Sequence, residues 1–183
     1  LECILSKNHS SVIINFSIAS NDYFDKCRFL SGGDAEVEIW ELIWDKYRST
    51  SEVLAYNILQ TPHHCSWRTL SLDSWSGKGE SAKESADAVN ALSQARKGAA
   101  IVASSKLIQD EDSDPPCIRA KRTYTRIVQQ LSVSGKFYCT GEYPKSTNVK
   151  PLIFEIDNVG VRVANKAVIG AASIAASPNL RAG

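Results

Sequence analysis

The chain of 183 residues is 43% hydrophobic and 22% charged, which predicts a globular domain with a substantial apolar core. Its 21 Lys and Arg residues are balanced by 20 Asp and Glu residues, so no basic excess indicates a nucleic acid or an anionic membrane surface as a partner. No apolar run reaches the roughly 20 residues that a membrane-spanning helix needs. The length predicts a single domain over residues 1–183.

The first part of the chain predicts a strand and then an amphipathic helix. In SVIINFSIAS, residues 11–20, the side chains alternate, which is typical of a strand with Phe16 on its apolar face. Asp34 can cap a helix that follows, in which Trp40 and Trp44 lie one turn apart on the same face. Aromatic side chains in this arrangement are typical of a helix face that is buried in a core.

Two capping boxes predict further helices. The first begins at Ser49 and predicts a short helix that ends before Pro62. The second begins at Ser81 and predicts a longer helix that ends at Gly98, because glycine is common just past helix ends. AAIVAS, residues 99–104, then predicts a buried strand.

The last third of the chain predicts strands. Ser134–Gly135 is a two-residue hairpin signal, and the residues on both sides alternate between apolar and polar. Residues 152–156 and 159–163 alternate again, so residues 127–173 predict an antiparallel meander with one apolar face. The predicted fold class is therefore α+β, with an N-terminal strand and amphipathic helices packed on a C-terminal antiparallel β-meander. The predicted core contains Phe16, Trp40, Trp44, Phe154 and Val161.

TPHHCSW, residues 61–67, contains two of the three histidines next to a cysteine. If this segment is extended, His63 and Cys65 point to the same side, and imidazole nitrogen and thiolate sulfur are both zinc ligands. Alternatively, Cys65 is a catalytic nucleophile with a histidine base, and His63 and His64 are the candidates nearest in sequence. The third interpretation is a loop with neither role. We expect the loop, and therefore predict no catalytic residue, no metal and no cofactor.

The five cysteines include no Cys-x-x-Cys pair, which argues against a zinc ribbon or a thioredoxin-like site. We predict that most of them are reduced and serve as small core residues.

SGKGES, residues 76–81, is a second candidate site. Glycines let backbone N–H groups approach an anion, and a lysine adds positive charge, so this loop could hold a phosphate or nucleotide ligand. The spacing of a phosphate-binding loop is absent, and a turn that leads into a helix explains the composition equally. The residues that would bind such a ligand are Gly77, Lys78, Gly79 and Ser81.

Three functional hypotheses follow. The first is a non-catalytic binding or self-assembly domain, because no catalytic motif is recognisable and the small residues of Ala167–Ala176 can pack closely against another protein. The second is a small hydrolase-like enzyme that uses Cys65 with a histidine base. The third is a phosphate- or nucleotide-ligand site in residues 76–81. We expect the first, with a protein partner or self-association and with neither a membrane span nor a nucleic acid partner.

Overall fold

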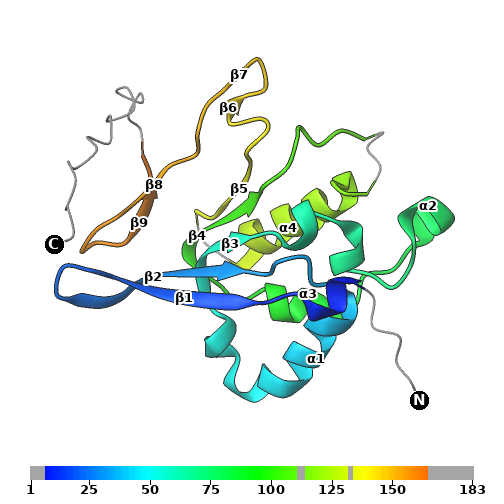
Figure 1. The fold of residues 1–183 in the computed structure, drawn as a ribbon, viewed down its shortest axis with the longest axis horizontal. Coiled ribbons are helices and arrows are strands. Elements are labelled where there is room, and N and C mark those ends of the chain that lie inside the picture. The colour runs from blue at the N-terminus through cyan, green and yellow to red at the C-terminus, as the bar shows by residue number, and fades with distance from the viewer. Residues whose placement is uncertain (1–6, 111–113, 132–133, 165–183) are drawn as a thin grey trace, which may run out of the picture.

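The computed structural model describes residues 7–110, 114–131 and 134–164. Five strands form its central sheet and follow one another from edge to edge in chain order (Figure 1). They are β1 (Ile14–Ser20), β2 (Tyr23–Ser31), β3 (Tyr56–Gln60), β4 (Ala95–Ala103) and β5 (Lys136–Cys139). β1 and β2 form an antiparallel hairpin, whereas β3, β4 and β5 each run parallel to the strand before them.

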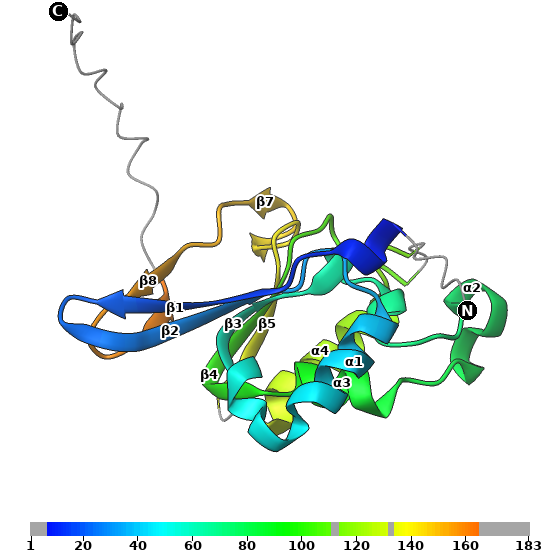
Figure 2. The same cartoon turned by 60° about the horizontal axis from the view of Figure 1, so that its bottom comes forward.

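Three α-helices cover one face of this sheet: α1 (Val37–Tyr47), α3 (Ala86–Leu92) and α4 (Ile118–Leu131) (Figure 2). They share this face because parallel strands in sequential order are joined by right-handed crossovers, which all pass on the same side. The connections contain a short helix, α2 (Trp75–Lys78), and four 3₁₀-helices, η2 (Arg48–Leu54), η3 (Pro62–His64), η4 (Trp67–Thr69) and η5 (Gly79–Ser81). A further 3₁₀-helix, η1 (Lys7–Ser10), precedes β1. Among the described residues, no helix is both long enough and apolar enough to cross a membrane.

Two small antiparallel ribbons follow the sheet. β6 (Pro144–Lys145) pairs with β7 (Asn148–Val149), and β8 (Phe154–Ile156) pairs with β9 (Val161–Val163). The ribbon of β8 and β9 lies beside the tip of the β1–β2 hairpin, where Ser20 Oγ is 3.5 Å from the carbonyl oxygen of Ile156 (Figures 1 and 2).

The core lies between the sheet and the helices. Leu30, Leu59 and Ile101 occupy paired positions on β2, β3 and β4, and each is at most 1% exposed. Trp40 of α1 is fully buried, which confirms its predicted core position. The prediction was wrong for Phe16, which is 46% exposed because the helices cover the other face of β1. Trp44, Phe154 and Val161 are partly buried.

The predicted C-terminal meander is wrong. Residues 118–131 form α4 instead, and β5 pairs in parallel with β4, so the chain has a mixed, mostly parallel sheet with helices. Ile127 and Leu131 are four residues apart, a spacing that suits one face of a helix. Ser134–Gly135 therefore connects a helix to a strand rather than two strands of a hairpin.

Three predicted helix boundaries are also corrected. The short helix expected after Ser49 is the 3₁₀-helix η2, and strand β3 follows it. Ser81 begins no long helix; the Oγ atom of Ser85 instead accepts a hydrogen bond from Ala88 N and caps α3. Gly98 lies inside β4 with φ +73°, so it does not end a helix. The strand predicted at residues 99–104 is confirmed within β4.

The segment Ala167–Ala176, which carries the prediction of self-association, lies outside the described residues.

Candidate functional site

The carboxyl ends of β2, β3, β4 and β5 meet at one edge of the sheet, because these four strands are parallel. Ligands of open, mostly parallel sheets are commonly bound outside this edge. Two segments named in the sequence analysis reach it. Gly32, Gly33 and Asp34 follow β2, and the segment Thr61–Cys65 follows β3.

The turn after β3 has an unusual backbone. His63, His64 and Cys65 have φ values of +46°, +54° and +71°, so three successive residues other than glycine adopt left-handed conformations. Each such residue costs roughly 1–2 kcal/mol relative to its right-handed form. The segment is therefore not extended, so the arrangement in which His63 and Cys65 point to the same side does not apply. His64 is exposed, His63 is half-buried and Cys65 is fully buried.

Tight packing and backbone hydrogen bonds hold this turn. A Cβ atom on Gly32 would lie 2.5 Å from Pro62 Cγ and 2.7 Å from Trp40 Cζ2, so only glycine allows the loop after β2 to approach so closely. The backbone N–H of Thr61 donates to Val102 O at 2.9 Å, and that of Cys65 donates to Pro62 O at 3.1 Å. Strain of this kind persists only where the surrounding structure determines the conformation, and it is concentrated at functional sites.

A backbone hydrogen bond joins the two loops. The N–H of His63 donates to the carbonyl oxygen of Gly33 at 2.8 Å, which places Asp34 in the loop beside the histidines. Asp34 does not cap α1 as predicted, because the residue at the helix start is Glu36. The Asp34 side chain is exposed and forms no ion pair or hydrogen bond with another described residue. Its carboxylate is therefore available to a ligand.

The His64 ring is oriented by the end of β4. Its Nδ1 atom lies 2.8 Å from the carbonyl oxygen of Ser104. A carbonyl oxygen can only accept, so Nδ1 is the ring nitrogen that donates in this contact, and Nε2 is the nitrogen left for a ligand. In His63, Nδ1 is buried and has no hydrogen-bond partner among the described residues.

Cys65 is in the wrong environment for a nucleophile. Its side chain is fully buried, and burial, followed by the nearby Cys117 and Cys139, raises the pKa of the thiol well above its usual value. A protonated, inaccessible thiol neither attacks a substrate nor binds a metal as thiolate. Within the described ranges, no group of three or more His, Cys, Asp or Glu side chains is arranged to hold a metal ion. The four described cysteines are buried and form no disulfide with one another.

The loop of residues 76–81 already uses the groups that a phosphate would need. Lys78 Nζ lies 2.6 Å from an Asp73 carboxylate oxygen, so its charge is neutralised within the chain. The Gly77 N–H donates to Ser74 Oγ, and Ser81 Oγ donates to the Lys78 carbonyl. Gly79 adopts φ +50° at the end of α2, so it serves a turn. These contacts argue against a phosphate site.

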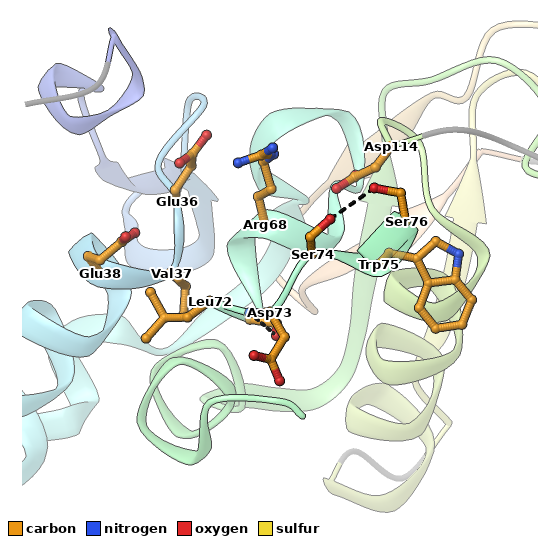
Figure 3. Close-up of a pocket in the computed structure, with 11 residues that line it drawn as sticks. Glu36, Val37, Glu38, Arg68, Leu72, Asp73, Ser74, Trp75, Ser76 and Asp114 are labelled. Atoms are coloured by element: carbon orange, nitrogen blue, oxygen red, sulfur yellow. Dashed lines mark hydrogen bonds between the residues drawn. The ribbon is translucent and has the colours of Figure 1, made fainter. Parts of the chain in front are cut away.

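An acidic pocket of about 280 Å³ lies between the start of α1 and the segment 68–76 (Figure 3). In this view the Arg68 guanidinium lies between the carboxylates of Glu36 and Asp114. Both carboxylates already accept hydrogen bonds, Asp114 from Trp67 N at 2.8 Å and Glu36 from Asn8 Nδ2 at 2.8 Å. Sequence reasoning missed this pocket, because its residues come from three distant segments with no shared motif.

The basic residues of α4 are paired with acidic ones. The shortest contacts are Arg119–Glu80 at 3.9 Å, Lys121–Glu142 at 2.7 Å, Arg122–Asp110 at 3.2 Å and Arg126–Glu84 at 2.5 Å. These pairs offset the positive charge of the helix.

Searches against protein-family models, curated proteins and solved structures returned no match.

Proposed function

We propose that this chain is a binding domain that takes a divalent transition-metal ion at the carboxyl edge of the sheet. Asp34, His63 and His64 become its ligands when their side chains rotate toward one another, since the described part of the chain does not hold them in a ready-made metal site. One observation carries the proposal: the 2.8 Å hydrogen bond from His63 N to Gly33 O holds the loop that contains Asp34 beside the strained histidine turn. Asp34 takes the place of Cys65 in the ligand pair suggested by the sequence, because Cys65 is buried.

The chemistry of these groups suits zinc or a similar ion, which binds imidazole nitrogen and carboxylate oxygen. A metal-binding histidine usually donates its other ring N–H to a carbonyl or carboxylate, and His64 makes this contact with Ser104. Three protein groups leave at least one coordination position of a tetrahedral ion unfilled. Water, or a group outside the described residues, completes the set.

The other hypotheses receive less support. The burial of Cys65 argues against the hydrolase, and the Lys78–Asp73 ion pair argues against the phosphate ligand. Self-association or a protein partner at Ala167–Ala176 stays a prediction, and it is compatible with a metal site at the sheet edge.

Equilibrium dialysis against zinc sulfate, followed by metal analysis of the protein, tests the proposal. We expect one zinc ion per chain, with affinity reduced at least about tenfold in Asp34→Asn and in His64→Ala. Asp45→Asn is the matched control and should bind zinc as the wild type does. No bound zinc, or equal binding by all variants, would contradict the proposal.

A further inference from the structure

An apolar groove runs between β1 and α1, on the side of the sheet that the helices cover. Its volume is about 510 Å³. In Figures 1 and 2, α1 is the cyan helix on the β1 side of the sheet. The lining side chains that define this β1–α1 groove are Ile13, Asn15, Ile39, Leu42, Lys46 and Val53.

The strand beside this groove is an open edge. β1 is the first strand of the sheet and pairs only with β2 among the described strands. Residues 11–20 contain no charged residue and no proline, the features by which edge strands commonly avoid pairing with other chains. The opposite edge differs, because β5 has only four residues and begins with Lys136.

The groove exposes large apolar side chains. Leu42 is 66% exposed and Val53 is 46% exposed, although both are aliphatic. Among the described residues that line the groove, Lys46 alone is charged. A ligand that covers these groups would therefore be largely apolar and would carry an acidic group near Lys46.

The floor of the groove contains an unsatisfied acceptor. Asn15 Nδ2 donates to the carbonyl oxygens of Val53 and Ala55, each at 3.0 Å, which fixes the orientation of the amide. Its Oδ1 atom is buried and accepts no hydrogen bond from the described residues. Buried polar atoms are nearly always paired, so this oxygen offers an acceptor to a donor of a bound ligand.

We propose that the β1–α1 groove binds an extended peptide segment of a partner protein, which adds to the free edge of β1 as a further strand. Main-chain hydrogen bonds to β1 supply affinity, and alternate side chains enter the groove, as in other cases of strand addition. The inward side chains are apolar and spaced two residues apart, about 6.6 Å along the strand. An aspartate, a glutamate or the peptide's terminal carboxylate meets Lys46.

Selection from a phage-displayed library of random octapeptides, with the purified chain as bait, tests this proposal. We expect enriched peptides with apolar residues at alternate positions and an acidic residue at one end. A synthetic copy of the most enriched peptide is then titrated against variants by fluorescence anisotropy. Leu42→Asp should weaken binding at least about tenfold, and Lys46→Glu should shift the preference to peptides with a basic end.

Two controls separate strand addition from other modes of binding. Leu72→Asp alters a leucine of nearly equal exposure, 68%, away from the groove, and should leave peptide affinity unchanged. Methylation of alternate backbone nitrogens in the peptide should abolish binding, because it removes the N–H groups that would pair with β1.

Three results would overturn the proposal. One is the absence of enrichment over a Leu42→Asp bait. Another is equal binding of the methylated peptide. The third is a dimer, seen by light scattering, that becomes monomeric on Leu42→Asp, since a second copy of the chain would then occupy the groove.

Discussion

Charged groups at the two ends of the parallel strands β2–β5 differ in whether they have ion-pair partners. At the amino end, Arg28 Nε lies 2.8 Å from Asp25, and Arg96 Nη2 lies 3.0 Å from Asp25 and 2.8 Å from Glu52. This network joins β2 and β4 and leaves each of these charges with a partner inside the chain.

At the carboxyl end, the Asp34 carboxylate lacks such a partner among the described residues, and the backbone of His63 and His64 is strained. We therefore expect polar residues at the amino end to contribute to stability, and those at the carboxyl end to contribute to the proposed metal binding. Substitutions at the two ends should therefore have opposite consequences for folding and for metal affinity.

The largest effect is expected for Gly32→Ala at the carboxyl end. The new Cβ would clash with Pro62 and Trp40, which form part of the packed support of the histidine turn. Overpacking of this kind costs about 3 kcal/mol in free energy of unfolding. Urea denaturation should report this loss, and zinc affinity should fall in parallel. Gly77→Ala is the control, because its Cβ would meet only ordinary contacts at 3.6 Å or more.

Arg96→Ala at the amino end should destabilise the fold without changing zinc affinity. The guanidinium is 26% exposed and contacts both Asp25 and Glu52. We expect a loss of about 1–2 kcal/mol in free energy of unfolding, less than for a fully buried pair because water screens these charges. Arg48→Ala removes a much more exposed ion pair with Asp45 and should change stability little. A clear loss of zinc binding in Arg96→Ala would contradict the view that residues at the amino end affect stability alone.

His64→Gly should stabilise the fold relative to His64→Ala. Glycine adopts the left-handed conformation at this position without the steric penalty of a Cβ atom. We expect a difference of about 1 kcal/mol in free energy of unfolding, with zinc affinity lost in both variants. Thermal denaturation of the two variants under the same conditions measures this difference in stability. Equal stability would show that the turn is not strained in solution.

The smallest effect concerns pH. The hydrogen bond from Arg28, which is the largest contribution, and that from Arg96 hold the pKa of Asp25 well below its usual range. A depressed folded-state pKa adds stability above the unfolded pKa of about 3.9, and this stability is lost as the pH falls through the folded value. Asp25→Asn should therefore flatten the decline in stability below about pH 4. An unchanged decline would mean that other carboxylates account for it.

Sequence reasoning succeeded where periodicity is local. The strand at residues 11–20, the helix containing Trp40 and the strand at residues 99–104 all follow from side-chain spacing within a few residues. It failed where strand direction mattered, because parallel pairing depends on contacts between segments far apart in the chain. The spacing of Ile127 and Leu131 also fits a helix, and this spacing alone does not distinguish the two interpretations.

The candidate site was partly visible in the sequence. His63 and His64 were recognised, but their left-handed turn could not be, because that conformation is typical of glycine and is imposed here by packing on Gly32. Asp34 was interpreted as a helix cap, a frequent role for aspartate after a glycine turn. Asp34 lies in the loop directly after β2. This position points to the carboxyl edge only once β2 is known to be parallel to β3.

Long-range ¹H–¹⁵N NMR of the histidine rings during addition of zinc sulfate would show whether His64 binds the metal ion. The contact with Ser104 predicts that His64 Nδ1 stays protonated while the Nε2 resonance moves to the position of a metal-bound nitrogen. Asp34→Asn should weaken this change. If His64 Nε2 keeps its metal-free shift at saturating zinc, or if Nδ1 loses its proton instead, the carboxyl edge of the sheet is not the metal site that we propose.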